Sequence, residues 1–417
     1  MAFDPSQSNA VDTLNGHFKE SYADKIKDLI PEGVKFYNMV EFNSADKQPG
    51  NYYHQPVTLG LEHGFTYGGA AGSAFALNDA VASAHQDAQV RGHELVLRSY
   101  LSVAAASRSK SKNSFVQESK LLVQNMLKSM VRRMEVQLMY GKSGLGIVKT
   151  VSTTSITLES YEWAAGIWSG AENMLVDFYN GATLVLGGAK IANVDFDLKK
   201  LTFTTDVAAA GVLATHKVFY KGAKANEFDG LHSILSNTGS IFGIDAASYS
   251  LWKSNTVEVG TNFSGGEAVL SFKKVEAAIA RGMEKGLADE EVTVICNPKS
   301  WNDLLTEQAA KRQYDSSYSE NKIKQGAKEI EFHGAAGMIK IVSSIYCKEG
   351  YAYVICPKEF SRIGSSDITF EQPGFEGKFL KLLENANAYE MRCYTDQALF
   401  CAAPGVMSLL TFIKNDN

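Results

Sequence analysis

The sequence predicts an α+β fold with two or more packed regions. Its 417 residues exceed what one hydrophobic core usually organises. Runs of alternating apolar and polar residues, typical of strands, occur beside runs with apolar residues at three- and four-residue spacing, typical of helices. The composition, 45% hydrophobic and 21% charged, is that of a folded protein, and no apolar run approaches the ~20 residues that span a membrane. The sequence therefore predicts neither a disordered nor a membrane-spanning chain.

The N-terminal residues and the cysteines indicate a reducing compartment. Residues 1–15 are polar and acidic and lack the basic flank and apolar stretch of a secretory signal, so export through a signal peptide is not expected. The cysteines are odd in number, lie in the last third of the chain and form no Cys-x-x-Cys pair. We therefore expect free thiols at all five. They are Cys296, Cys347, Cys356, Cys393 and Cys401.

The N-terminal part of the chain predicts a short helix followed by a long arm. Residues 16–31 have apolar side chains at helical spacing and end at Pro31, so they form an amphipathic helix that needs a partner surface. Two extended runs follow, Tyr52 to Tyr67 and Val90 to Ala104, which predict a two-stranded arm with a flexible tip. An isolated hairpin is marginally stable in water, so we expect the arm to lie on another surface, such as a second subunit.

A long helix is predicted over Asn113 to Tyr140, because neither Gly nor Pro interrupts this stretch and apolar residues recur at helical spacing. At ~1.5 Å per residue it would be roughly 42 Å long. Asn113 or Ser114 can cap its start, and Gly141 would supply the left-handed residue at its end. Its methionines predict packing rather than a cofactor site; they include Met126, Met130 and Met134.

The remainder of the chain mixes strands and helices. Short β runs punctuated by Gly and Asn fill residues 145–229 and predict a small antiparallel sheet or barrel. An amphipathic helix over Ser271 to Gly286, a buried strand over Val292 to Cys296 and a second helix from Pro298 follow. The last predicted strands are Met338 to Ser343, Tyr351 to Cys356 and Ala388 to Thr395.

No motif for catalysis, a cofactor or a metal is complete. Gly141-Lys142-Ser143 resembles the end of a phosphate loop, but Val136 stands where the first glycine is required, and the segment ends a helix instead of opening one. His93-Glu94 begins like a zinc-protease motif, but Leu97 replaces the second histidine. There is no Gly-x-Ser-x-Gly elbow. We expect no enzyme activity, no cofactor and no metal, although side chains distant in sequence could still converge.

One stretch of the chain is markedly basic although the net charge is −5. Between positions 91 and 133 nine basic residues stand against two acids. Two hypotheses remain open: these residues pair with a neighbouring subunit, which we favour, or they contact nucleic acid phosphates without sequence specificity. The nine are Arg91, Arg98, Arg108, Lys110, Lys112, Lys120, Lys128, Arg132 and Arg133.

The order of these elements resembles the major capsid proteins of tailed bacteriophages with the Hong Kong 97 fold. Short sequence segments show the same resemblance. Residues 140–148 (YGKSGLGIV) resemble the turn after their long spine helix, and residues 230–239 (GLHSILSNTG) resemble the entry to their A-domain. Residues 294–304 (VICNPKSWNDL) and 350–357 (GYAYVICP) resemble core pieces of that A-domain. The resemblance covers nearly the whole chain.

The resemblance implies six regions. An N-terminal arm would be followed by a projecting hairpin called the E-loop, the spine helix with its P-domain, an inserted β-rich subdomain, the A-domain and the last P-domain strands. The inserted subdomain could project from the shell, steady the subunit or bind a decoration protein. The implied ranges are 1–50, 51–106, 107–144, 145–229, 230–387 and 388–417.

The resemblance also implies a function and partners. The chain would assemble with itself into hexamers and pentamers of an icosahedral head around double-stranded DNA, found in the virion and built in the host cytoplasm. Scaffolding, portal and decoration proteins would be its partners, with no membrane. Some relatives crosslink through an E-loop lysine, but no lysine lies between Lys47 and Lys110, so such a crosslink is not expected. An encapsulin-like nanocompartment and an α+β hydrolase with an unrecognised site are the alternatives.

Overall fold

The computed structural model describes most of the chain beyond the N-terminal segment. The described ranges are 33–43, 52–70, 72–103, 118–237, 239–260, 268–288, 290–312, 330–334, 337–371, 380–383 and 386–415. The predicted helix over residues 16–31 therefore lies outside the described residues. Within them no helix is long and apolar enough to cross a membrane.

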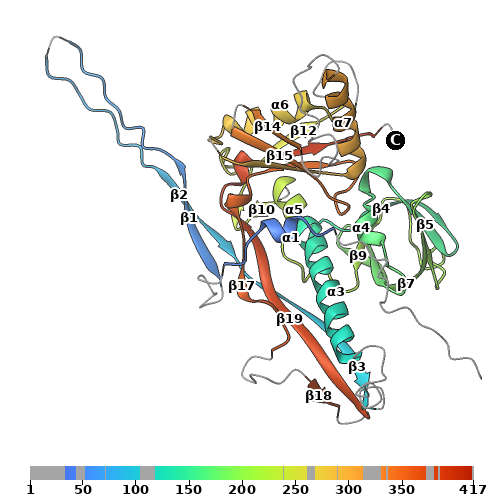
Figure 1. The fold of residues 1–417 in the computed structure, drawn as a ribbon. Helices are drawn as coiled ribbons and strands as arrows, with labels where there is room; N and C mark the ends of the chain where they lie inside the picture. The colour runs from blue at the N-terminus through green and yellow to red at the C-terminus, as the bar shows by residue number, and fades with distance from the viewer. Residues whose placement is uncertain are drawn as a thin grey trace, which may run out of the picture.

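The centre of the molecule is a long helix lying on a sheet (Figure 1). Helix α3, Glu118–Tyr140, contains the described part of the predicted helix and ends at the predicted residue. Alternate residues of the strands beneath it face the helix, where Met126 and Met130 pack with Met391 and Cys393. The strands are β3 His93–Ser102, β17 Phe360–Thr369, β18 Leu380–Leu382 and β19 Ala388–Cys401, with β3 along one edge of β19 and β17 and β18 along the other.

The end of the long helix corrects one prediction. Gly141 does not have a left-handed backbone; the residue with φ of 60° is Lys142. A glycine is needed at 141 for a different reason, because a Cβ there would lie 2.3 Å from the carbonyl oxygen of Phe228. Glycine is required at position 141 because the backbone that follows the barrel passes close to it, and not because the turn needs a left-handed residue there.

A two-stranded hairpin projects from the body (Figure 1), but its strands are not those predicted. Strand β1, Tyr53–Gly60, pairs with β2, Ala84–Val90, and not with the run that begins at Val90. A break at Arg91 and Gly92 separates β2 from β3, whose ten residues all pair with β19. The alternation in β3 was recognised correctly. Its inward leucines face helix α3, however, which sequence spacing alone does not reveal.

The predicted insertion contains a closed six-stranded barrel. Its order is β4-β5-β8-β7-β6-β9, so within these six strands no edge is left open. Strand β7 was not predicted because Gly187 and Gly188 interrupt its pattern. The strands are β4 Gly146–Ser152, β5 Ser155–Leu158, β6 Leu175–Asn180, β7 Thr183–Asp195, β8 Lys200–Phe203 and β9 Lys217–Tyr220. Two short helices follow β5: η3 Ser160–Glu162 and α4 Ala165–Trp168.

A mixed six-stranded sheet forms the far end of the body. The predicted buried strand β13, Val292–Cys296, lies near its centre with all five residues buried, and the two predicted helices pack against other strands of the same sheet. The sheet order is β12-β20-β16-β13-β15-β14. The bounds are β12 Asn255–Glu258, β14 Ile330–Gly334, β15 Gly337–Ser343, β16 Ala352–Ile355, β20 Ser408–Thr411, α6 Phe272–Met283 and α7 Pro298–Arg312.

Short elements complete the described chain, and the cysteines behave as expected. All five are free and buried. The short elements are α1 Phe36–Met39, α5 Leu231–Leu235, β10 Ser240–Ile241, β11 Ile244–Asp245, η5 Pro357–Glu359 and η6 Pro404–Val406.

Candidate intersubunit surfaces

The start of the described chain is bound to the long helix by one buried carboxylate. Glu135 on α3 is fully buried and accepts hydrogen bonds from the backbone N–H groups of Lys35 (3.0 Å), Phe36 (3.0 Å) and Tyr37 (2.6 Å). These are the unpaired donors at the start of α1, where a negative side chain is favourable. Burial outweighs these bonds and raises the pKa of Glu135. These hydrogen bonds fix residues 35–37 to α3.

A second buried group holds the same segment from the sheet side. The Arg362 guanidinium on β17 donates to the carbonyl oxygen of Val40 (2.9 Å), to Asp367 (2.9 Å) and to the amide oxygen of Gln397 (3.0 Å). Its cation lies 4.1 Å from the ring centre of Tyr37. Residues 35–43 are therefore held between α3 and β17.

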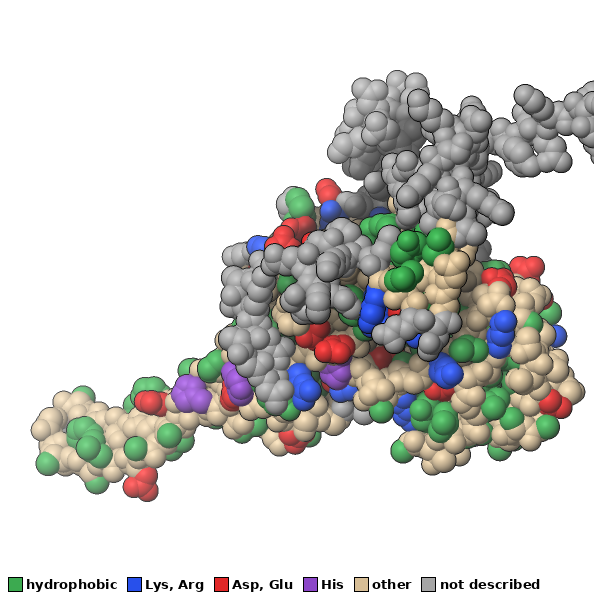
Figure 2. All heavy atoms as spheres, turned by 90° about the horizontal axis from the view of Figure 1, so that it is seen from below, with side chains coloured by type: hydrophobic (Ala, Val, Ile, Leu, Met, Phe, Trp, Pro, Cys, Tyr) green, Lys and Arg blue, Asp and Glu red, His purple; other side chains and the backbone are tan. Residues whose placement is uncertain are grey.

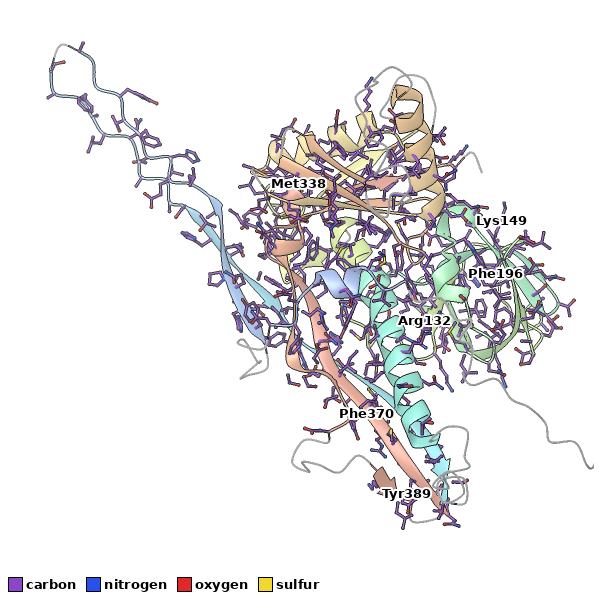
Figure 3. All side chains as sticks on the ribbon, in the orientation of Figure 1. Arg132, Lys149, Phe196, Met338, Phe370 and Tyr389 are labelled. Atoms are coloured by element: carbon purple, nitrogen blue, oxygen red, sulfur yellow. The ribbon has the colours of Figure 1, made fainter. Side chains whose placement is uncertain are left out.

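Two adjacent arginines of the basic stretch join α3 to the barrel side of the body. Arg132 donates to the hydroxyl of Tyr346 (3.0 Å) and to the carbonyl oxygens of Ser169 (2.7 Å) and Gly166 (3.3 Å). Arg133 lies over the Tyr220 ring at 3.2 Å. Figure 3 shows Arg132 where α3 meets the neighbouring helix and strands. Both side chains thus serve contacts inside the subunit.

A buried polar network joins the barrel connection to the mixed sheet. Lys348 Nζ lies 2.6 Å from Glu162 Oε2, and both side chains are almost fully buried. Glu162 also accepts a hydrogen bond from the Tyr351 hydroxyl (2.8 Å), and the Lys348 backbone N–H donates to the Tyr140 hydroxyl (2.8 Å). Such a pair is stable only when its partners are fully satisfied. Beside it, burial lowers the pKa of His232 to about 4, so this imidazole is neutral.

The hairpin exposes apolar side chains along its tip. Tyr67 is 92% and Leu77 81% exposed, and Leu61, Phe65 and Phe75 are exposed as well. Residues 52–90 contain no Lys or Arg; their charged side chains are Glu62, Asp79 and Asp87, with three histidines. Figure 2 shows the projecting arm with apolar, acidic and histidine side chains, while Lys and Arg gather over the body. A large exposed apolar set usually marks an interaction site.

The face of the β3–β19 pair turned away from α3 is also open. Its cross-strand rungs place Glu94 opposite Asp396, Val96 opposite Tyr394 and Arg98 opposite Arg392. On β3, Val96 is 49% exposed, and Glu94 and Arg98 are exposed; their β19 partners Arg392, Tyr394 and Asp396 are half-buried. We call these six residues the open sheet face. It offers a partner an acidic end, an apolar middle and a basic end.

A hollow of about 980 Å³ lies between the base of the hairpin, the barrel and α3. Arg91, His93, Glu94 and Arg133 are among the residues that line it. His93 Nδ1 lies 2.9 Å from the carbonyl oxygen of Asn226, and burial lowers the pKa of this histidine. Across the described ranges no group of three His, Cys, Asp or Glu side chains could hold a metal.

The basic residues whose side chains the structure describes do not form one surface. Arg98 lies on the open sheet face, Arg91 in the hollow, and Arg132 and Arg133 in contacts within the subunit. Lys128 is half-buried on α3, and the backbone of Lys120 belongs to the same helix. Outside the described residues lie Arg108, Lys110 and Lys112.

Sequence inspection missed the residues that complete these surfaces. Arg392 and Asp396 lie about three hundred positions after the β3 residues they face, and only the strand register brings them together. Glu135 and Arg362 were missed because a single buried charge within an ordinary helix or strand has no sequence signature. The acidic tip of the hairpin, in contrast, could have been recognised from the absence of Lys and Arg over residues 52–90.

Comparisons with known proteins give a clear answer for the fold. No family model and no curated protein matches the sequence. The chain is similar in structure to the cyanophage A-1(L) capsid, with a TM-score of 0.60 and 10% identity over 97% of this chain and 99% of that one.

The chain is also similar in structure to two further capsids. The capsid of a native GTA particle has a TM-score of 0.51 and 10% identity over 98% of this chain and all of that one. The capsid of cyanophage P-SCSP1u has a TM-score of 0.50 and 11% identity over the full length of both chains. The likeness confirms the predicted fold class: the chain is an α+β protein with the Hong Kong 97-like capsid fold.

Proposed function

We propose that this protein is the major capsid protein of a tailed bacteriophage, and that it assembles with itself into an icosahedral head around double-stranded DNA. One observation carries the proposal. A chain with the fold of capsid subunits extends a hairpin whose apolar tip is unsupported by its own body. A second subunit is the partner that would cover such a tip in a closed shell.

Assembly would proceed through the regions implied by the fold. The hairpin of one subunit would lie over its neighbour within hexamers and pentamers. The long helix, fastened at Glu135 and Arg132, would keep the subunit rigid. The A-domain would surround the axis of each ring. The proposed regions are the N-terminal arm 1–50, the E-loop 51–106, the spine helix with its P-domain 107–144, the inserted β-rich subdomain 145–229, the A-domain 230–387 and the last P-domain strands 388–417.

The partners follow from the same proposal. A scaffolding protein would guide assembly, a portal would occupy one vertex, and decoration proteins could bind the barrel. The protein would be assembled in the host cytoplasm and remain in the virion. The proposal assigns no catalysis: the cysteines are buried, and burial raises the pKa of Cys356 to about 12 and of Cys393 to about 11, which opposes nucleophilic use.

The test is to express the chain alone and with a candidate scaffolding protein, and to examine the products by size exclusion and electron microscopy. Shells, tubes or five- and six-membered rings are expected. A compact monomer under all conditions would contradict the proposal. Nucleic acid content separates a phage head, which packages DNA, from a nanocompartment that holds a protein cargo.

A further inference from the structure

The open sheet face has an arrangement that is unfavourable within a single subunit. Like charges directly opposite each other destabilise an antiparallel strand pair. Here this occurs twice on one face, with two carboxylates at one rung and two arginines four residues further along β3. An apolar rung, Val96 with Tyr394, lies between them. A partner with complementary charges would relieve the repulsion at the basic rung.

The basic end of the face carries excess positive charge. Arg392 donates to both carboxylate oxygens of Glu390, at 2.9 and 3.1 Å. Lys381 lies opposite the same Glu390 on the other side of β19, and Arg98 is close enough to help lower the pKa of that carboxyl after its bond from Arg392. Three cations therefore share one carboxylate. Among the described residues Arg98 forms no ion pair and lies instead over the Tyr100 ring, at 5.6 Å.

The hairpin tip has the complementary chemistry. Its carboxylates Glu62 and Asp79 are exposed, and no Lys or Arg lies near them in the sequence. The two sides of the tip run together, since the His63 N–H donates to the Val81 carbonyl (3.2 Å). Exposed apolar side chains stand beside both carboxylates, as the apolar rung stands beside the basic one. Complementary charge of this kind fixes register between partners.

A subunit's hairpin cannot reach its own open sheet face. The hairpin leaves β3 at the Arg91 end, and the basic rung lies further along β3 in the other direction (Figure 1). Between Arg91 and the turn of the arm lie about 19 residues, roughly 60 Å at ~3.3 Å per residue. The occupant must therefore belong to a second copy.

We propose that the open sheet face of one subunit binds the hairpin tip of a second copy, with Arg98 and Arg392 pairing with Glu62 and Asp79. This inference rests on the proposed shell function and adds the residues that select the docking position. Since the pairs are electrostatic, docking weakens as salt rises.

The test is Arg98→Glu. This substitution lets position 98 pair with Arg392 across the strands, so the subunit should fold as well as the wild type by circular dichroism and thermal melting. Assembly should nevertheless need at least about tenfold more protein, equivalent to roughly 1.4 kcal/mol. Combining it with the reversal of one tip charge, Glu62→Lys or Asp79→Lys, should restore shells for the carboxylate that pairs with position 98, whereas either hairpin substitution alone should impair them. Lys149→Glu, the same charge change at an exposed position on β4, is the matched control and should assemble normally.

The outcomes separate this inference from the shell function. If the wild type forms shells and Arg98→Glu forms them equally well, the docking proposal is wrong and the shell function stands. Normal shells that retain less DNA would assign the basic rung to nucleic acid and also overturn the docking. A wild-type chain that never assembles would refute both.

Discussion

The barrel and the hairpin are both additions to the helix-and-sheet centre of the subunit, but they are stabilised in opposite ways. The barrel closes on itself, its inward side chains such as Val176, Phe178 and Leu201 are buried, and buried polar contacts tie it to the body. The hairpin has two strands and exposes apolar side chains at its tip. The barrel's stability therefore lies within one chain, whereas our proposal assigns the ordering of the hairpin to a second subunit.

The largest effect on the isolated subunit should come from breaking the buried ion pair beside the barrel. Lys348→Met leaves the Glu162 carboxylate buried without its cation, which should cost about 3–5 kcal/mol of unfolding free energy. Urea unfolding measures it. The double variant Lys348→Met with Glu162→Gln should recover part of the loss, and equal stability of single variant and wild type would contradict the role given to this pair.

Acid should weaken the same region through His232. The pKa of a histidine in an unfolded chain is near 6.5, but burial lowers the pKa of His232 to about 4. The unfolded chain therefore binds the extra proton first, and stability should fall by roughly 3 kcal/mol as pH drops from about 6.5 to 4. Unfolding followed at several pH values checks this. His232→Gln should flatten the slope in that window, and an unchanged slope would exclude His232 as its source.

A smaller loss is expected where α3 meets the barrel side of the body. Arg132→Ala removes three hydrogen bonds, including that to the Ser169 carbonyl, and should lower the unfolding free energy by about 1–3 kcal/mol. Lys149→Ala on the exposed surface of β4 is the comparison and should change stability by less than about 0.5 kcal/mol. Similar melting temperatures for the two variants would show that the hydrogen bonds of Arg132 do not stabilise the subunit.

The smallest effect on the isolated subunit should come from the hairpin. Phe65→Ser with Leu77→Ser should alter unfolding by less than about 0.5 kcal/mol, because both side chains are already exposed. The same variant should assemble poorly, as judged by sedimentation of shells. A variant that loses subunit stability but still assembles would contradict the claim that these hairpin side chains serve assembly and not the stability of the isolated subunit.

Sequence patterns predicted most elements and failed where register decides. Residues 118–140 form one helix because their own spacing requires it, and Val292–Cys296 form a buried strand for the same reason. The partner of β3 could not be predicted, because both an arm strand and a sheet strand alternate every two residues. β7 was hidden by its paired glycines.

The candidate surfaces were predicted less completely than the fold. Arg132 and Arg133 are neighbours in sequence, but they contact different parts of the subunit, so adjacency in sequence does not place these two arginines on a shared exposed surface. The rung of Arg98 with Arg392 depends on pairing between strands far apart in the chain. A charged surface can be predicted from sequence only where all of its charged residues belong to one element, as they do in the hairpin.

The most direct measurement is amide hydrogen exchange of the hairpin in free subunits and in assembled shells. Residues 52–90 should exchange rapidly in the free subunit and become protected in shells, whereas the barrel over residues 146–220 should be protected in both. Equal exchange of the hairpin in the two states would contradict the claim that a second subunit completes it.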